Sequence, residues 1–522
     1  MRIHPSLGAS SLALLSLASL GALAGCSGKA EALSKVEPSD ESFASMPAPP
    51  EGGPKLAARA PLRVFALPST SSKELGEIGV GGVVARSAGP VTNKACAAGW
   101  YAVRPHGFVC ADAGVSLDAR KPKSVADAAL DRALPYRYGR ARVDGVPLYA
   151  RVPTLAEQLE AEPELAKHPP KPLDQEVLGV AANDVPLDAH AVASGPPVLL
   201  PTGDGVEGGK RTTLSFFTFT NTLEAPTTTF AIASPAKIGV LKKGTGVALA
   251  GAYVAEGPGD AASNHRAPRR FGVTPDGLLA PLDRLRPALG STWHGIDLEA
   301  VGLPIAFVHK QGVHTFGMQK GKAQKRDDEL ERKTAVPLSG KFRTVEGVKY
   351  FETREGEWMR AQDIVLVVKR TKFPDFARGK QRWIDVSIAN QTLTVYEGTR
   401  PLYATLVSTG RDLLKDAATS ASTPRGNLRV TGKAVRKSLD AKEVAGAFDP
   451  LDAPWALDLE GGVTMAGSYF GDGVGEASTF HDILMTPIDA HRVWSWAEPG
   501  LPDGWSAASD PGGEGTVVSV RP

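Results

Sequence analysis

The sequence predicts a mainly β protein built from several small modules. Its 522 residues include 56 Gly and 41 Pro, which indicate frequent turns, and short apolar stretches recur at strand period. A chain of this length is expected to form two to four domains. We expect a small N-terminal barrel, central β-rich modules and a C-terminal β-sandwich with one helix.

The charge composition excludes one class of partner. The chain carries 59 basic and 57 acidic side chains and a net charge of +2. No global field therefore draws it to nucleic acid, and we expect no nucleic-acid partner. No stretch predicts a cofactor, and no cluster of side chains has the spacing of a metal site, so we expect neither.

The first 25 residues predict a secretory signal peptide. Arg2 precedes an apolar stretch centred on 12–15 that continues to Leu20, which is too short for a convincing membrane span. The ending Leu23-Ala24-Gly25-Cys26 resembles the bacterial lipobox, which implies lipidation of Cys26; an ordinary signal with an incidental cysteine is the alternative. Buried acyl chains contribute roughly 0.8 kcal/mol per CH2, so lipidation would anchor the chain to a membrane. Ser27 resembles the sorting pattern for the periplasmic face of a Gram-negative outer membrane.

Two N-terminal regions follow the signal. Residues 26–60 are rich in Ser, Pro, Glu and Ala and predict a flexible linker. Residues 61–120 alternate apolar and polar side chains between closely spaced turns, as in 62–66, 79–84 and 100–103, which predicts a small barrel. This succession resembles bacterial SH3-like domains, which commonly bind cell-wall components.

Cys96 and Cys110 bracket the Trp-Tyr hairpin of this barrel. They are the only cysteines besides Cys26, and no further metal ligands lie nearby. In an exported protein, such a pair predicts a disulfide, worth about 3 kcal/mol in the chain-entropy model.

Residues 121–380 predict a central β-rich region whose fold the sequence does not define. Thr154 followed by Glu157 forms a capping box that predicts the start of a short helix. Strands are expected in 227–232 and 247–250, and a further small unit in 336–368. The basic, aromatic stretch 369–382 is expected to be a solvated linker.

Residues 381–522 give the clearest pattern. In Trp383–Ile388, Ile384, Val386 and Ile388 share one face, which predicts a half-buried strand. Two more strands follow, at 392–396 and 402–409. Thr486-Pro487 predicts a helix start, with Ile488, Val493, Trp494 and Ala497 facing the core, and 515–520 predicts a closing strand.

The order of these elements resembles the YkuD-type catalytic domain of L,D-transpeptidases. The resemblance rests on Ser408-Thr409-Gly410, Thr423-Pro424-Arg425-Gly426, Pro454-Trp455, Glu460-Gly461-Gly462, Gly467, Tyr469, Asp472, Gly475, Pro487-Ile488-Asp489-Ala490 and the final Gly-Thr-x-Val strand. Family members read roughly PW-x4-EGG-x3-HG-x10-11-SHGC before the PIDA-like helix start. The family cross-links peptidoglycan through a cysteine thiolate, which implies peptidoglycan or its stem peptides as the partner.

The residues that carry the family chemistry differ in this chain. Laid over the frame without a gap, the first family histidine falls on Ala466, and the SHGC quartet falls on Thr479, Phe480, His481 and Asp482. A carboxylate with a reference pKa near 3.9 is a poor acyl-transfer nucleophile, and Phe480 cannot accept a proton. Shifting the register by one residue loses the PIDA match and still provides no cysteine.

Three hypotheses follow from this pattern. We favour an envelope lipoprotein that binds peptidoglycan, or a wall-modifying enzyme, without catalysis. The alternative is an active L,D-transpeptidase-type enzyme in peptidoglycan cross-linking, and a third is a structural envelope protein with a filled cleft.

Overall fold

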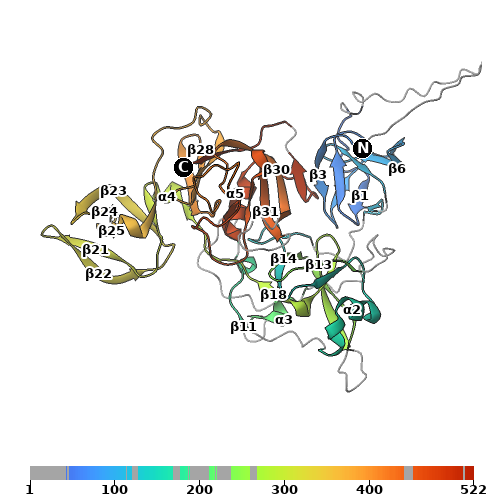
Figure 1. The fold of residues 1–522 in the computed structure, drawn as a ribbon. Coiled ribbons are helices and arrows are strands. Elements are labelled where there is room, and N and C mark those ends of the chain that lie inside the picture. Colours follow the sequence, from blue (N-terminus) through green and yellow to red (C-terminus); the bar gives the residue numbers. More distant parts are fainter. Residues whose placement is uncertain are drawn as a thin grey trace, which may run out of the picture.

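The computed structural model describes Phe43 and residues 46–112, 114–119, 127–168, 177–185, 187, 211–217, 219, 237–258, 267–439, 451–509 and 512–522. The signal peptide with Cys26, most of the predicted linker and the strand expected at 227–232 lie outside these residues. The mainly β prediction is confirmed: strands dominate four units, with the C-terminal domain in the centre (Figure 1). Among the described helices, none is long and apolar enough to cross a membrane.

The first module comprises residues 55–116 and eight short strands. They are β1 (Lys55–Ala58), β2 (Leu62–Phe65), β3 (Glu74–Ile78), β4 (Val83–Ala85), β5 (Val91–Asn93), β6 (Cys96–Ala102), β7 (Phe108–Cys110) and β8 (Val115–Ser116). The predicted linker ends earlier than residue 60, because β1 pairs with β4 and β8 and buries Leu56. The resemblance to SH3-like domains stays a prediction.

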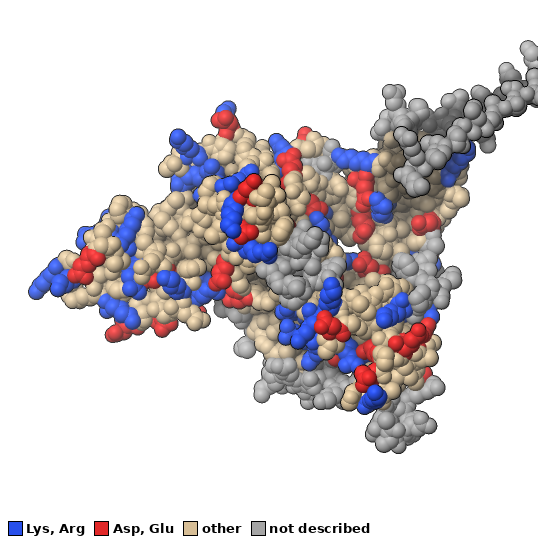
Figure 2. Space-filling view, viewed as in Figure 1, with Lys and Arg blue, Asp and Glu red and all other residues tan. Residues whose placement is uncertain are grey.

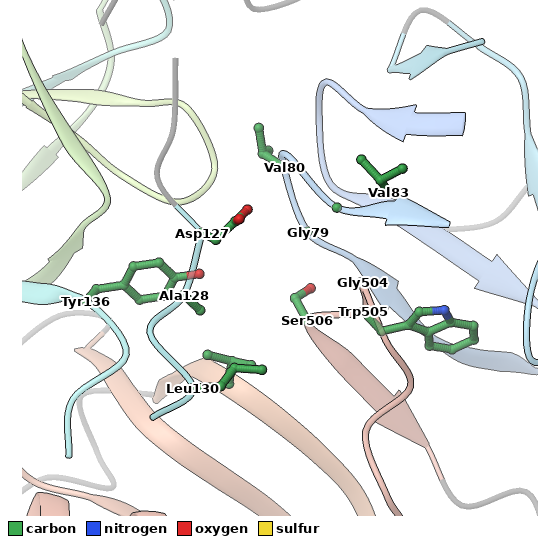
Figure 3. Close-up of a pocket in the computed structure, with 12 residues that line it drawn as sticks. Gly79, Val80, Val83, Asp127, Ala128, Leu130, Tyr136, Gly504, Trp505 and Ser506 are labelled. Carbon is green, nitrogen blue, oxygen red and sulfur yellow. The ribbon is translucent and has the colours of Figure 1, made fainter. Parts of the chain in front are cut away.

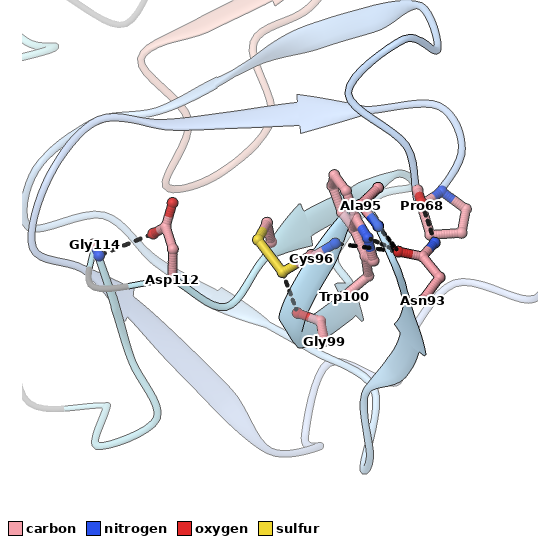
Figure 4. The surroundings of a disulfide bond; sticks show 9 residues. Pro68, Asn93, Ala95, Cys96, Gly99, Trp100, Asp112 and Gly114 are labelled. Atoms are coloured by element: carbon pink, nitrogen blue, oxygen red, sulfur yellow. Dashed lines mark hydrogen bonds between the residues drawn. A yellow bond between two sulfur atoms is a disulfide. The ribbon is translucent and has the colours of Figure 1, made fainter.

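The disulfide between Cys96 and Cys110 is confirmed (Figure 4). It links β6 to β7 beside Trp100, whose Nε1 donates to Asn93 Oδ1 at 3.0 Å. Asn93 Oδ1 also accepts from the backbone N–H groups of Ala95 and Cys96. The disulfide and Asn93 together hold the hairpin predicted from the sequence.

The second module comprises residues 137–288, and its described residues form three sheets, with strand orders β13-β10-β17-β16-β15, β14-β9-β18 and β11-β12. Its strands are β9 (Arg137–Ala141), β10 (Val146–Tyr149), β11 (Val177–Leu178), β12 (Arg211–Thr212), β13 (Lys237–Leu241), β14 (Gly246–Leu249), β15 (Gly251–Gly257), β16 (Ala267–Val273), β17 (Leu279–Pro281) and β18 (Leu285–Ala288). The helices are α2 (Leu155–Ala161) and α3 (Thr213–Phe216), with 3₁₀ turns at Pro163–Ala166, Ala182–Asp184 and Leu282–Arg284. The capping box predicted from Thr154 and Glu157 starts α2.

The third module comprises residues 298–367 and extends away from the rest of the molecule (Figure 1). It contains α4 (Leu298–Val301), β20 (Ile305–Val308), β21 (Val313–Gln319), β22 (Lys322–Leu330), β23 (Ala335–Val345), β24 (Val348–Thr353), β25 (Trp358–Arg360), a 3₁₀ turn at Ala361–Asp363 and β26 (Ile364–Val367). Its sheet has the order β22-β21-β25-β24-β23-β20-β26. The unit predicted at 336–368 therefore begins earlier, because β20 to β22 belong to the same sheet.

The C-terminal domain comprises residues 382–521 together with β19 (Ile296–Asp297), which pairs with β29. Its elements are β27 (Arg382–Ser387), β28 (Thr392–Glu397), β29 (Arg400–Leu406), β30 (Gly426–Leu439), β31 (Leu451–Leu459), a 3₁₀ turn at Glu460–Gly462, β32 (Thr464–Gly467), β33 (Ile483–Met485), α5 (Pro487–Trp496), β34 (Ala507–Ser509) and β35 (Val517–Arg521). The predicted helix is confirmed: Thr486 caps α5, and Ile488, Val493 and Trp494 are buried.

The prediction of a half-buried strand at 383–388 was wrong in one respect. β27 lies between β28 and β35, and both of its faces are buried, including Asp385 and Ser387. Arg370 and Arg521 pair with the buried Asp385 carboxylate. Phe373 and Phe376, from the stretch expected to be a solvated linker, pack edge-on against Trp383. The linker thus covers the outer face of the strand.

The first module and the C-terminal domain share one sheet. β3 pairs antiparallel with β34, with Gly76 opposite Ala508. Trp505 is buried in the first module's core and donates from Nε1 to the Arg104 carbonyl at 2.9 Å. Beside this contact lies a cavity of about 340 Å³ lined by Tyr136, Asp127 and Ser506 among others (Figure 3). The C-terminal domain therefore completes the first module.

The second module docks on the C-terminal domain through a shared apolar core. Tyr138 stacks on Tyr469 with ring centroids 4.1 Å apart. Trp455 Nε1 donates to the Ala133 carbonyl at 2.7 Å, just before the module begins. His491 of α5 shares a 2.8 Å hydrogen bond between Nε2 and the Leu130 carbonyl. Burial of apolar side chains and these directed bonds fix the two units together.

Substituting Gly76 should separate the first module from β34. The residue has a φ of +149°, and a Cβ there would lie 2.2 Å from the Ala507 carbonyl oxygen. We expect Gly76→Ala to destabilise the protein by about 2–3 kcal/mol in urea unfolding, because backbone atoms cannot yield as a flexible side chain can. Gly89→Ala, whose Cβ would meet nothing within 4 Å, is the matched control and should be neutral. Equal stability of the two variants would contradict the shared sheet.

Acid should weaken the contact between α5 and the segment that precedes the second module. Burial lowers the pKa of His491, outweighing its bond to the Leu130 carbonyl and the nearby Asp131 carboxylate. Because the unfolded imidazole has a pKa of about 6.5, the unfolded chain binds the proton first as the pH falls. Stability contributed by neutral His491 should therefore be lost below about pH 6.5. His491→Gln, which keeps a donor for Leu130, should flatten this part of the pH profile of the urea midpoint; an unchanged profile would refute the assignment.

Candidate functional site

Three residues of the YkuD-type frame, Ser408, Asp472 and Thr479, line one small cleft. Its volume is about 200 Å³, and it is lined by Ser408, Ser468, Phe470, Gly471, Asp472, Gly473, Val474, Ser478, Thr479 and Leu484. Its walls carry both hydroxyl groups and apolar side chains, and among the described residues that line it Asp472 alone is charged. The cleft can therefore offer hydrogen bonds and apolar contact to a ligand.

Two strands and two turns build the floor of the cleft. β32 and β33 run parallel, with Ala466 beside Leu484. Ser408 bridges to Leu484, and Gly410 bridges to Thr479. A Cβ on Gly410 would lie 2.3 Å from the Ala421 carbonyl oxygen, so only glycine fits the predicted Ser-Thr-Gly turn.

The Thr-Pro turn supports the same segment from behind. Thr423 Oγ1 accepts from the Gly410 N–H at 2.9 Å and donates to the His481 carbonyl at 2.8 Å. Both turns quoted for the family resemblance thus hold the stretch that precedes β33.

Thr479 and Asp482 are both buried at this stretch. Thr479 Oγ1 donates to the backbone carbonyl of Asp482 at 2.6 Å. Asp482 Oδ1 accepts from the Thr464 N–H at 2.8 Å. The side chain at the frame's nucleophile position therefore binds the backbone of β32, and Asp482 is not among the residues that line the cleft.

Phe480 and His481 are half-buried and do not line the cleft. Their rings lie 4.3 Å apart, and the Arg411 guanidinium stands 5.8 Å from the Phe480 ring. His481 Nε2 is 3.0 Å from the Ser420 carbonyl oxygen. His481 and Asp482 thus have separate partners, as expected for neighbours that point to opposite faces.

Ala466, at the frame's first histidine position, lies in the core shared with the second module. It is fully buried, in one cluster with Tyr138, Tyr469 and Leu484. The Tyr138 and Tyr469 hydroxyls are buried without a hydrogen-bond partner in the described part of the chain, and burial raises the pKa of both well above 10. This environment is apolar, so it could not easily hold a charged imidazole.

In the part of the chain that the structure describes, neither a metal site nor a free thiol lies at the cleft. Within the described ranges no group of three His, Cys, Asp or Glu side chains could hold a metal ion. Cys96 and Cys110 are bonded to each other in the first module. None of the cleft-lining residues is a cysteine or a histidine.

Sequence analysis missed one residue at the mouth of the cleft. Lys333, between β22 and β23 of the third module, donates from Nζ to both the carbonyl and Oδ1 of Asp472, each at 2.6 Å. The run from Lys320 to Lys333 reads as a solvated segment, and nothing local distinguishes Lys333. Its partner lies 139 residues further along the chain, so only the fold reveals the pair.

Removing the Asp482 carboxylate should weaken the fold. The Thr464 N–H is buried and would lose its acceptor, which typically costs about 1–3 kcal/mol. We expect this loss for Asp482→Ala in urea unfolding, with Asp375→Ala, whose side chain is fully exposed, as a neutral control. An Asp482→Ala variant as stable as the control would show that the carboxylate has no structural role.

Comparison with known proteins points to one family. Residues 381–482 match the YkuD family model, described as the L,D-transpeptidase catalytic domain. No curated protein matches the chain.

Several solved structures are similar to part of the chain. The L,D-transpeptidase of Xylanimonas cellulosilytica is 19% identical with a TM-score of 0.19, covering 29% of this chain and 65% of that one. The catalytic domain of the E. faecium L,D-transpeptidase is 17% identical with a TM-score of 0.19, covering 28% and 99%. The L,D-transpeptidase from Mycobacterium smegmatis is 15% identical with a TM-score of 0.22, covering 42% and 92%. This chain thus spans just under two thirds of the first of these structures. From the family match, residues 381–482 of this chain form a YkuD-type L,D-transpeptidase catalytic domain.

Proposed function

We propose that the protein binds peptidoglycan stem peptides in this cleft without catalysing their cross-linking. One observation carries the proposal: the cleft persists at the family's catalytic segment, while Ala466, Phe480 and Asp482 stand where the frame expects two histidines and the cysteine. A scaffold that keeps its cleft but loses its reactive groups is suited to recognition.

The chemistry of acyl transfer supports the non-catalytic part. The reaction needs a thiolate that attacks a carbonyl and a base that removes the thiol proton. Asp482 is buried against the Thr464 N–H and does not reach the cleft, and Phe480 cannot carry a proton. Loss of a general base alone typically costs a factor of about 10²–10⁴. An active transpeptidase would need both the thiolate and the base, and the frame positions of this chain provide neither.

The lining of the cleft supports the binding part. Ser408, Ser468, Ser478 and Thr479 bring four hydroxyls. Those of Ser408 and Thr479 donate to backbone carbonyls and offer a ligand their oxygens as acceptors, whereas those of Ser468 and Ser478 can donate as well as accept. Phe470, Val474 and Leu484 supply apolar surface between them. Peptide amides with small apolar side chains, as in a stem peptide, match this combination.

The N-terminal residues support a proposal for the place of action. The signal-like residues 1–25 and the lipobox-like Cys26 support an exported lipoprotein at the periplasmic face of a Gram-negative outer membrane. A lipid at Cys26 would hold the protein on the membrane beside the wall. Wall-modifying enzymes are further candidate partners, reached through the three upstream modules.

Retention on the wall tests the binding part. Purified sacculi should co-sediment the soluble chain from residue 46 onward, which keeps the shared sheet intact. Gly473 lines the cleft, its φ is ordinary, and a Cβ there meets nothing within 4 Å, so Gly473→Trp can block the cleft without backbone strain. We expect at least tenfold less retention for this variant, an effect of about 1.4 kcal/mol. Gly89→Trp, equally open but in the first module, should be retained like the wild type.

Two outcomes of this experiment would contradict the proposal. Equal retention of Gly473→Trp and the wild type would place wall recognition outside the cleft. Failure of the wild type to sediment would refute peptidoglycan binding.

The cross-link profile tests the non-catalytic part. Sacculi incubated with the wild type should give an unchanged muropeptide profile by mass spectrometry. New cross-links would restore the alternative of an active enzyme, and Asp482→Ala and His481→Ala would then identify the responsible group.

A further inference from the structure

We propose that the cleft selects an uncharged peptide segment and that Lys333 of the third module sets this selectivity. The inference rests on the proposed function of the cleft and specifies the chemistry of its ligand. It also gives the third module a role, because that module supplies a residue to the mouth of a cleft in another domain.

At the mouth of the cleft, the carboxylate of Asp472 is paired with the ammonium group of Lys333. Asp472 is the one charged side chain among the cleft-lining residues, and its side chain is 61% exposed. Left alone, such a carboxylate would attract an ammonium group of a ligand. Lys333 Nζ lies 2.6 Å from Asp472 Oδ1, and Ser291 Oγ donates to the same oxygen at 2.7 Å. The pair cancels the charge that the cleft would otherwise present.

Lys333 is held in place as a fixed group. Its side chain is only 3% exposed, and its backbone has a φ of 70°, a conformation that few non-glycine residues adopt. Trp293 Nε1 donates to the Lys333 carbonyl at 3.2 Å, and the Trp293 ring lies 5.3 Å from Nζ. A lysine that served only solubility would extend into water, whereas this one is buried against a single carboxylate.

The ion pair also shapes the wall of the cleft. Lys333 Nζ bonds the Asp472 carbonyl as well as its side chain, which fixes the backbone next to Gly473. Ser408 Oγ donates to the Gly473 carbonyl from the opposite side at 3.3 Å. Arg332 pairs with Glu476 at 2.8 Å, further along the same loop and outside the cleft lining. The third module thus fixes the loop that forms one wall.

An uncharged ligand segment fits this arrangement best. The four hydroxyl oxygens can accept from amide N–H groups, and Ser468 and Ser478 can also donate to amide C=O groups; neither kind of bond needs a counter-charge. A charged group entering the cleft would lose water beside Phe470, Val474 and Leu484 and would find the Asp472 carboxylate already occupied by Lys333. The cleft therefore favours a neutral, amide-bearing stretch over an amine or a free carboxylate.

Two peptides that differ by one charge test the proposal. N-acetyl-Ala-Lys-Ala-amide and the same peptide acetylated on its lysine amine can be titrated into the soluble chain by calorimetry. We expect the wild type to bind the neutral peptide roughly fivefold more tightly. Lys333→Met frees the Asp472 carboxylate and should reverse this order. The double variant Lys333→Met/Asp472→Asn removes both charges and should restore the preference for the neutral peptide.

Matched variants separate the charge effect from a loss of structure. Arg326→Met removes the ion pair between Arg326 and Glu357 of the same module, neither of which lines the cleft, and should leave the wild-type ratio unchanged. If Lys333→Met does not fold, Asp472→Asn is used as the test variant. It leaves the Lys333 cation without its carboxylate, so the preference for the neutral over the charged peptide should become larger than in the wild type.

The outcomes also separate this inference from the proposed function. The inference is overturned if the wild type prefers the charged peptide. It is also overturned if the ratio of the two affinities is the same in the wild type, in Lys333→Met and in the double variant. If the wild type binds neither peptide but still sediments with sacculi through the cleft, the inference fails and the proposed function stands. If it fails in both assays, both are refuted.

Discussion

The packing of the second module against β32 determines which side chains the segment beside the cleft can carry. Ala466 lies in that contact, surrounded by Tyr138, Tyr469 and Leu484. An imidazole is much larger than the Ala466 methyl group, and position 466 is fully buried in this packed cluster, so a histidine there would force its neighbours apart. Packing of the second module and a histidine at this position therefore compete for the same face of β32. In this chain position 466 belongs to the apolar contact, and the cleft is lined by hydroxyl groups and not by histidine.

A second consequence concerns the upstream modules. Each of the three contacts the C-terminal domain through a different element: β34 for the first, β31 for the second, and the loop at 471–476 for the third. The C-terminal domain lies at the centre of these contacts (Figure 1). Basic and acidic side chains are interspersed over the visible surface, in keeping with the net charge of +2 (Figure 2). Recognition is therefore expected from local geometry and not from a long-range field.

Local signals predicted local structure well. The capping box at Thr154, the Thr486-Pro487 helix start and the disulfide each depend on residues close in sequence, and all three are present. Periodicity identified β27 but not the burial of its polar face, because Arg370 and Arg521 come from outside the strand. The β3–β34 pairing and the Lys333–Asp472 pair join residues far apart in the chain, and no spacing rule reveals them. Sequence thus located the segment of the cleft, and tertiary contacts determined its chemistry.

Transpeptidase chemistry at this cleft would need more than one substitution, as the surroundings of Asp482 show first. A cysteine at 482 would leave the Thr464 N–H without its carboxylate acceptor, and the thiol would still face β32 instead of the cleft lining. A histidine at 480 would stand beside His481 and Arg411, whose cation opposes protonation of an imidazole. A histidine at 466 would disrupt the core with the second module. Each of these three groups is thus opposed by a contact that stabilises the fold, which supports the proposal of a cleft that binds without catalysis.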